Sequence, residues 1–458
     1  MVVCLEYICG LGDEELSREK KFEFFSETRH AFGRTALIFS GGANMGLYHY
    51  GVAKCLFEEG LFPRIIAGSS IGSIFASFIC TKRMDELPDF LNPDRINLQA
   101  FYKRDSKKSF IRKLMRLFSE GHFLDNEVIK EFMRDNIGDV TFQEAYDRTG
   151  WILNITATGY GEHDGYRLLN YLTAPNVLIW SAVCASCAIP YIYGPAILYC
   201  KNEEGQIEPY IPGNRKFVDG SIGADLPMQN LSELFNVNYF IVSQTNPWVV
   251  PFMNHSESYR HSKRAIIFRA WEFIKDFIGS EIKHRINQLE KLGILSSAIA
   301  RYVNLITQQY GGHVTIWPHP TLNDFIHLLD NPTHEMLRRC LIKGATRVYH
   351  KVNHIASVLV VERALERNYV KAKILHERPA VRLYKGVGEA NHEESTESNE
   401  NDTHPDTLFD DVDYMPRNSI GYERKTQAHH PDIHVHSGEH LQNERLTSLG
   451  LFKYVEEQ

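Results

Sequence analysis

The sequence predicts an α/β fold in which helices cover both faces of a mostly parallel sheet. Short apolar runs typical of buried strands occur at 35–40, 64–67, 151–156 and 238–244. Runs with apolar residues at helical spacing alternate with them. Parallel strands are normally joined by helices, so this alternation favours three α/β/α layers. A length of 458 residues and an apolar content of 43% allow one large domain with appended segments.

The first predicted strand ends in a glycine-rich turn, Ser40–Gly46, with the sequence SGGANMG. An amphipathic run, Leu47–Phe57, follows it. Successive N–H groups in such a turn can bind a phosphate or the oxyanion of an acyl-transfer intermediate. A nucleotide site would need G-x-G-x-x-G or a GK[ST] ending, and the turn has neither. A plain strand–helix turn is the alternative interpretation.

The second predicted strand leads into Gly68–Gly72, which reads G-x-S-x-G with Ser70 at its centre. A helix-like run, 73–78, follows. Strand, sharp turn and helix are the context in which this pattern forms a nucleophile elbow. The glycines let the backbone crowd the turn and tolerate a strained serine. The helix N-terminus offers N–H groups and a positive dipole end to a developing anion.

A third motif, Asp219–Ser221, follows the short strand-like run Lys216–Val218. A carboxylate at a strand end can face a serine at another strand end, although D-G is also a common turn dipeptide. A triad of Ser, Asp and His is the rival chemistry. The histidines available for such a triad are His313, His319, His327 and His334.

In their order and spacing, the three motifs resemble those of patatin-like phospholipases. The stretches 176–190, 226–238 and 240–247 resemble the fungal and plant triacylglycerol lipase branch, and the resemblance covers roughly residues 20 to 350. It implies the patatin-like three-layer fold and a lipid substrate. It also implies an esterase without a cofactor or metal, and the sequence has no H-E-x-x-H motif.

By this resemblance, Ser70 is the nucleophile and Asp219 the base of a Ser–Asp dyad. Gly41, Gly42 and Ala43 supply oxyanion N–H groups. The glycines that shape the turns are Gly46, Gly68, Gly72 and Gly220. Burial should raise the pKa of Asp219 toward neutrality, which makes it a better base.

The chain departs from the family pattern in the glycine-rich turn. Many patatin-like proteins have a third glycine where Ala43 stands and a basic residue where Met45 stands. Alanine still presents its N–H, whereas the missing cation can alter the preference for a lipid head group. Members of this branch usually carry a substantial N-terminal extension, and about thirty residues precede the first predicted strand here.

These features predict hydrolysis of neutral glycerolipid, with triacylglycerol as the substrate. A phospholipase or lysophospholipase, with or without transacylase activity, is the enzymatic alternative. His319 and Asp324 match H-x4-D, a pattern of glycerolipid acyltransferases that also occurs by chance. A lipid-droplet scaffold or regulator is the non-enzymatic alternative.

Composition and the N-terminal sequence limit the partners and the cellular location that we expect for this protein. The net charge of −7 gives no reason to expect a nucleic-acid partner. The eight cysteines form no apparent disulfide framework, and Cys184 and Cys187 are interpreted as buried thiols rather than a metal pair. The N-terminus lacks the basic region of a signal peptide, and no apolar run of about 18 residues occurs. We therefore expect an intracellular protein at a lipid droplet or membrane surface.

Two stretches are candidates for lipid contact, and ordinary packing is the alternative for each. Residues 101–118 read as a basic amphipathic helix, and 264–289 place aromatic and aliphatic residues on one face. The chain as a whole divides into four predicted segments. They are an N-terminal helical or loose segment at 1–33, a lipase domain at 34–250, a helix-rich extension at 251–385 and a disordered acidic tail at 386–458.

Overall fold

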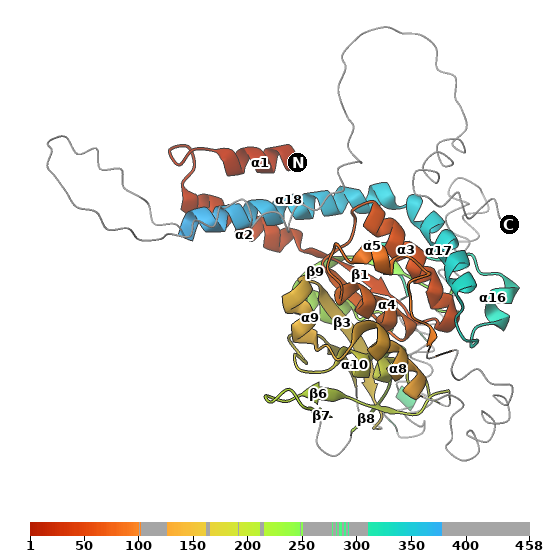
Figure 1. Cartoon of the computed structure of the whole chain (residues 1–458). Helices are drawn as coiled ribbons and strands as arrows, with labels where there is room; N and C mark the ends of the chain where they lie inside the picture. The colour runs from red at the N-terminus through yellow and green to blue at the C-terminus, as the bar shows by residue number, and fades with distance from the viewer. Residues whose placement is uncertain are drawn as a thin grey trace, which may run out of the picture. The chain divides into compact units, whose positions relative to one another are not determined.

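The computed structural model describes most of the chain up to residue 377. The described residues are 1–99, 101, 126–161, 165–190, 192–210, 215–247, 249–250 and 310–377, with isolated positions between 277 and 292. They form two compact units (Figure 1). One unit combines Met1–Gly33 with the described chain from Ala356, and the other runs from Arg34 to Ile355.

The larger unit is built on an eight-stranded sheet with the order β10-β9-β1-β2-β3-β8-β5, in which β4 pairs with β3. The strands are β1 (Arg34–Phe39), β2 (Ile65–Gly68), β3 (Ile152–Gly159), β4 (Tyr166–Leu169), β5 (Ala196–Ile197), β8 (Lys216–Asp219), β9 (Val237–Ser243) and β10 (Val314–Ile316). The five strands from β10 to β3 run parallel, whereas β8 and β5 are antiparallel to their neighbours. The mostly parallel sheet and its four predicted strands are confirmed. A separate hairpin pairs β6 (Tyr199–Lys201) with β7 (Ile207–Pro209).

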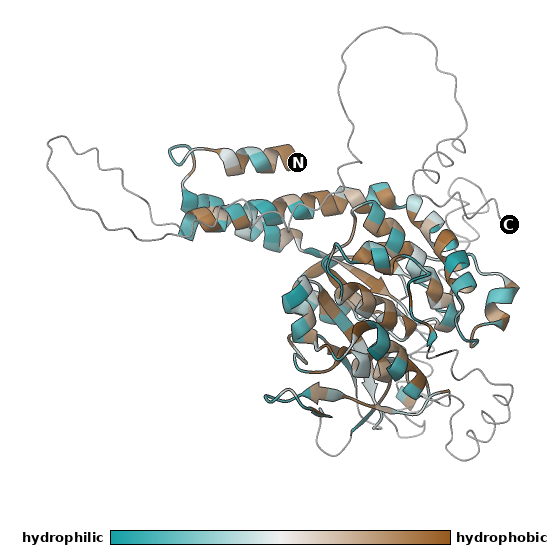
Figure 2. Ribbon diagram, in the orientation of Figure 1, coloured by the Kyte–Doolittle hydropathy of each residue, from teal (hydrophilic) through white to brown (hydrophobic). Residues whose placement is uncertain are grey.

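Helices follow the strands and cover the sheet. In the larger unit they are η1 (Ala43–Leu47), α3 (Tyr48–Glu58), α4 (Ile71–Cys80), α5 (Leu87–Phe90), α8 (Asn126–Ile137), α9 (Phe142–Thr149), α10 (Ile179–Ser186), α11 (Gly220–Ala224), α12 (Met228–Phe235), α16 (Leu322–Ile326) and α17 (His334–Tyr349). Helix α18 (Val352–Glu377) begins in this unit and continues into the other. The central strands are mostly hydrophobic, as Figure 2 shows, because both of their faces are buried.

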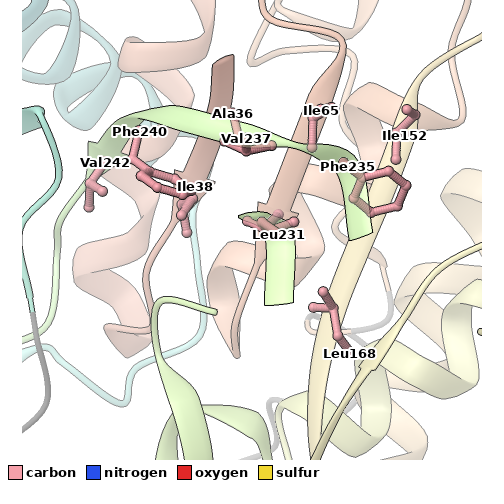
Figure 3. Close-up of a cluster of buried hydrophobic side chains, with 11 residues drawn as sticks. Ala36, Ile38, Ile65, Ile152, Leu168, Leu231, Phe235, Val237, Phe240 and Val242 are labelled. Carbon is pink, nitrogen blue, oxygen red and sulfur yellow. The ribbon is translucent and has the colours of Figure 1, made fainter. Parts of the chain in front are cut away.

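Figure 3 shows the core on one face of the sheet. Leu231 and Phe235 of α12 pack there against Ala36, Ile38 and Ile65. Leu37 and Phe39 alternate to the opposite face and are also fully buried. Burial of a Leu or Phe side chain contributes roughly 1.5–3 kcal/mol, so the packing of α12 stabilises this face of the sheet substantially.

Helices α3 and α17 cross in close backbone contact. A Cβ atom added to Gly51 of α3 would collide with the carbonyl oxygen of Leu341, and one added to Gly344 of α17 would collide with that of Tyr48. Residues far along the chain therefore support the helix that follows the glycine-rich turn. The larger unit continues past residue 250 through β10 and α17.

The smaller unit consists of α1 (Val2–Gly10), α2 (Arg18–Phe32) and the later part of α18. Ser17 caps α2 by accepting a hydrogen bond from the N–H of Lys20. Leu5 and Phe25 share a small core with Ala364, Leu365 and Ala372.

An ion pair joins α2 to α18 within the smaller unit. Arg29 pairs with Glu366 at 2.8 Å, and its guanidinium lies 4.0 Å from the centre of the Tyr369 ring.

Several predictions fall on parts of the chain that the structure does not describe. Of the predicted basic stretch 101–118 only Phe101 is described, the stretch 264–289 is described only at isolated positions, and the tail 386–458 lies outside the described residues. Within the described part, no helix is long and apolar enough to cross a bilayer. The same residues contain no cluster of His, Cys, Asp and Glu suited to a metal ion.

Candidate active site

The three motifs come together where β1, β2 and β8 end. Phe39 and Gly68 are register partners in the parallel pair β1–β2, so the turns that follow these strands emerge side by side. Asp219 ends β8 and pairs with Ala157 of β3. An ideal Cβ on Gly41 would lie 3.4 Å from the Cβ of Ser70 and 3.5 Å from that of Ser221. Gly41 therefore contacts both the serine motif and the D-G-S motif.

Ser70 occupies a strained turn between β2 and α4. Its backbone has φ 51° and ψ −126°, in the left-handed region that disfavours a side chain. Its N–H donates to the Ser186 hydroxyl at 2.9 Å, and its carbonyl accepts from the Ser73 hydroxyl at 2.6 Å. The next helical turn packs directly on β1, because a Cβ on Gly72 would collide with the carbonyl oxygen of Phe39. This is the geometry of a nucleophile elbow.

Asp219 is fully buried at the start of α11. Its Oδ1 accepts a hydrogen bond from the N–H of Ser221 at 2.8 Å, whereas Oδ2 has no hydrogen-bond partner of good geometry among the described residues. Burial raises the pKa of Asp219 to about 6, against the opposing effects of Ser221 and the nearby Ser70 hydroxyl. The Ser70 side chain is thus near enough to influence the carboxyl group, and one carboxylate oxygen remains available to it.

The glycine-rich turn is held by a second buried carboxylate, which the sequence motifs did not identify. Asp225 accepts a hydrogen bond from the Gly41 N–H at 2.7 Å, and its other oxygen lies 3.5 Å from Nδ2 of Asn246. Burial and the charge of Asp219 raise the pKa of Asp225 to about 7, against the opposing effects of Gly41 and Asn246. The Gly41 amide, one of three predicted oxyanion donors, is therefore already engaged.

The remaining predicted donors lie in the next two residues of the turn. The Gly42 carbonyl accepts from the Met45 N–H at 3.1 Å. Ala43 has φ 46°, a backbone conformation that glycine adopts more readily than alanine. Asn44 fixes the end of the turn, because its N–H donates to the Leu328 carbonyl at 3.1 Å.

The other predicted glycines shape the elbow and its neighbours. A Cβ on Gly46 would collide with the Ile71 side chain, and one on Gly220 with the Thr156 carbonyl oxygen. A Cβ added to Gly68 would likewise collide with the backbone of Gly72. All the predicted turn glycines thus lie where backbone approaches other atoms too closely for a side chain.

Three of the histidines considered for a triad, His313, His327 and His334, make contacts away from Ser70 and Asp219, and the fourth is exposed. Nδ1 of His313 accepts from the Phe240 N–H at 3.1 Å. His327 pairs with Asp330 at 2.6 Å, His334 lies 2.8 Å from the Pro93 carbonyl oxygen, and His319 is exposed. None of these contacts involves Ser70 or Asp219.

Asp324 of the H-x4-D pattern caps helix α16. Its Oδ2 accepts from the Thr321 N–H at 2.8 Å and from the Thr321 hydroxyl at 2.9 Å. Tyr48 donates to the same oxygen at 3.2 Å, and Arg339 lies 3.4 Å from the other. Burial acts to raise the pKa of Asp324, but the Thr321 hydrogen bonds and the nearby Lys343 and Arg339 charges outweigh it and hold the pKa below its usual value. The carboxylate is thus occupied by structural contacts.

Cys184 and Cys187 are buried thiols, as predicted. Burial raises the pKa of Cys187 well above its usual value, although the Ser73 and Ser70 side chains lower it. The nearby Asp219 charge also raises it. Cys187 therefore belongs to the wall of the site as a neutral thiol.

The sequence of this chain is similar to those of known proteins. Residues 37–231 match the family model described as patatin-like phospholipase. The triacylglycerol lipase ptl3 of Schizosaccharomyces pombe is 34% identical over 394 residues, which cover 82% of this chain and 78% of that protein. This chain belongs to the patatin-like phospholipase family. The resemblance read from its motifs is confirmed.

Two longer relatives of this patatin-like protein show the same relationship. Triacylglycerol lipase SDP1L of Arabidopsis thaliana is 38% identical over 373 residues, covering 79% of this chain and 45% of the relative. Triacylglycerol lipase 4 of Saccharomyces cerevisiae is 38% identical over 382 residues, which cover 80% of this chain and 42% of that relative. The chain matches somewhat under half the length of these two relatives.

Proposed function

We propose that this patatin-like protein is a serine esterase that hydrolyses acyl esters of neutral glycerolipid, with triacylglycerol as its substrate. The observation that carries the proposal is the position of Asp219: a buried carboxylate, with one oxygen unengaged, beside a serine on a strained strand–helix turn. The three relatives described above are all named triacylglycerol lipases, which supports this substrate class.

In the proposed mechanism, Ser70 and Asp219 act as a dyad. Oδ2 of Asp219 accepts the hydroxyl proton as Oγ of Ser70 attacks the ester carbonyl carbon. The tetrahedral intermediate collapses, the proton passes to the departing alcohol oxygen, and the acyl group remains on Ser70. A water molecule then loses its proton to Asp219, attacks the acyl carbon and releases the fatty acid, with the proton returned to Ser70.

The oxyanion of each tetrahedral intermediate needs hydrogen-bond donors. Because the Gly41 amide is held by Asp225, we assign this role to the N–H groups of Gly42 and Ala43. The dipole of α4, which begins next to Ser70, adds positive potential at the same place.

We propose that the enzyme works at the surface of a lipid droplet or membrane, since its substrate is insoluble in water. Residues 101–118 and 264–289 remain the predicted lipid-contacting stretches. Phospholipid hydrolysis and acyl transfer are the competing activities that an assay must separate.

The test is fatty-acid release by purified full-length protein from emulsified triacylglycerol and, in parallel, from phospholipid vesicles, with a chelator present. Ser70→Ala and Asp219→Asn should each abolish release. Ser77→Ala is the matched control, because this buried hydroxyl lies on the same helix and has no hydrogen-bond partner among the described residues. It should retain full activity.

Release from phospholipid alone would replace the substrate proposal with a phospholipase. Activity that survives Ser70→Ala would refute the dyad, whereas the absence of Ser70-dependent release from either lipid would favour the scaffold interpretation.

A further inference from the structure

The peptide that joins Gly41 to Gly42 is held by two hydroxyl groups on its carbonyl oxygen. The Ser40 hydroxyl donates to the Gly41 carbonyl at 2.9 Å, and the Thr245 hydroxyl donates to it at 3.2 Å. The two residues are themselves linked, because the Thr245 N–H donates to Oγ of Ser40 at 2.8 Å. Ser40 follows β1 and Thr245 follows β9, so the ends of two paired strands converge on one peptide group.

This contact determines where the Gly42 amide points. The C=O and N–H of a trans peptide lie in one plane and point in opposite directions. A carbonyl fixed toward Thr245 therefore directs the Gly42 N–H away from Thr245. The Gly42 backbone also rests on Thr245, since an added Cβ would lie 2.5 Å from both its carbonyl oxygen and its Oγ1. The peptide is thus fixed by contacts at its carbonyl and along its backbone.

A buried histidine sets the direction of the hydrogen bonds behind this peptide. His49 of α3 is fully buried, with Nε2 at 2.9 Å from the Ser40 carbonyl oxygen and Nδ1 at 2.7 Å from Oγ of Ser243. A carbonyl oxygen only accepts, so Nε2 carries the proton and Nδ1 accepts from the Ser243 hydroxyl. Burial lowers the pKa of His49 to about 4, which keeps the ring neutral near pH 7.

The same ring determines what the Thr245 hydroxyl does. Nε2 of His49 lies 3.1 Å from Oγ1 of Thr245. Since this nitrogen is a donor, Oγ1 accepts from it and its own proton is directed to the Gly41 carbonyl. Hydrogen bonds in this network are therefore donated in one direction: from Ser243 to His49, from His49 to Thr245, and from Thr245 to the Gly41 carbonyl.

We infer that Thr245 is a positioning residue that aims the Gly42 amide at the acyl oxygen, with its hydroxyl oriented by His49. The inference rests on the proposed esterase function and adds to it a group outside the three sequence motifs. Thr245 touches neither substrate nor Ser70 in this scheme. It acts through the peptide that supplies an oxyanion donor, and such donors act chiefly on the transition state.

The test compares Thr245→Val, which has nearly the same shape without the hydroxyl, with Thr245→Ser, which keeps it. We expect Thr245→Val to lower kcat by ~10- to 100-fold, below the full loss of a donor, with KM within about twofold of the wild type. Thr245→Ser should recover most of kcat. The thermal unfolding temperature of each variant shows that the comparison is made between folded proteins.

A second variant tests the other hydroxyl group that holds this peptide, that of Ser40. Ser40→Ala removes the other hydroxyl on the Gly41 carbonyl and should also lower kcat without raising KM. It serves in place of Thr245→Val if the valine variant fails to fold.

The outcomes separate this inference from the function on which it rests. Wild-type kcat in Thr245→Val, or an equal loss in Thr245→Ser, would overturn the inference while an inactive Ser70→Ala leaves the esterase proposal intact. Full activity in Ser70→Ala would instead show that Ser70 is not the nucleophile and would remove the proposed mechanism on which the inference rests.

Discussion

The amide of Gly41 donates a 2.7 Å hydrogen bond to the fully buried carboxyl group of Asp225. This bond holds the peptide before the oxyanion turn, as Thr245 and Ser40 hold the peptide after Gly41. It also places two buried carboxyl groups, those of Asp219 and Asp225, next to Ser70 and Gly41.

Replacing Asp225 should separate its structural contact from its charge. Asp225→Asn keeps an oxygen for the Gly41 amide, so we expect a folded enzyme with kcat/KM within about threefold of the wild type at pH 6. Asp225→Ala leaves a buried N–H unsatisfied and should lower the free energy of unfolding by about 1–3 kcal/mol, with at least a tenfold loss of kcat/KM. Denaturant unfolding and esterase assays check both values. Equal behaviour of the two variants would contradict this role.

Activity should depend on the ionisation of Asp219. Only the carboxylate can accept the Ser70 proton, and burial raises its pKa to about 6. We therefore expect kcat/KM to fall about tenfold per pH unit below pH 6 on a soluble short-chain ester. A profile that stays flat down to pH 4.5 would show that Asp219 is not the base.

The raised pKa of Asp219 also predicts a pH-dependent stability effect. A folded-state pKa of about 6, above the ordinary value of 3.8, means that stability present at low pH is lost as the pH rises through 6. Asp219→Asn avoids this loss and keeps the acceptor for the Ser221 N–H. At pH 8 the variant should therefore be more stable than the wild type, by up to roughly 3 kcal/mol in the free energy of unfolding, and should unfold at a higher temperature. At pH 4 the two proteins should be equally stable. The measurement is thermal unfolding at both pH values.

Backbone strain at Ser70 should appear as a stability difference between two inactive variants. Ser70→Ala keeps a Cβ at φ 51°, whereas Ser70→Gly removes it. We expect the glycine variant to be the more stable by about 1 kcal/mol in chemical unfolding, after allowance for the greater freedom of glycine in the unfolded chain. An alanine variant as stable as the glycine variant would mean that the elbow stores no strain.

The H-x4-D pattern should contribute to folding rather than to acyl transfer. His319 is exposed and Asp324 caps α16, so His319→Ala should leave both hydrolysis and transacylation unchanged. Asp324→Ala should lower the free energy of unfolding by about 1–2 kcal/mol through loss of the cap. Transacylation of labelled monoacylglycerol distinguishes the two roles, and its selective loss in His319→Ala would restore the acyltransferase interpretation.

The longer strands and the glycine-rich turns could be predicted from the sequence, because each has a recognisable local pattern. β1, β2, β3 and β9 are rich in apolar and β-branched residues, and the turns after β1 and β2 have distinctive glycine patterns. β5 and β10 have two and three residues, too few for any period to show. Their places in the sheet depend on pairing with distant strands.

The residues that support the site were harder to find, for a related reason. Asp225 lies 184 residues from Gly41 and Thr245 lies 205 residues from Ser40, so nothing local marks either pair. His49 looks in the sequence like one polar residue in an amphipathic helix. Only the pairing of β1 with β9, together with the position of α3, shows that these single residues share one buried hydrogen-bond network.

The pairing of β1 with β9 and the crossing of α3 with α17 give the site an order of assembly. Ser70 is synthesised before Asp219, Thr245 and the helix α17, which packs on Gly51. Until Val237–Ser243 has been synthesised, one edge of β1 lacks its partner. The nascent chain therefore carries the proposed nucleophile before the groups proposed to activate it have been made, and the proposed esterase activity must wait until Thr245 and the helix α17 are in place.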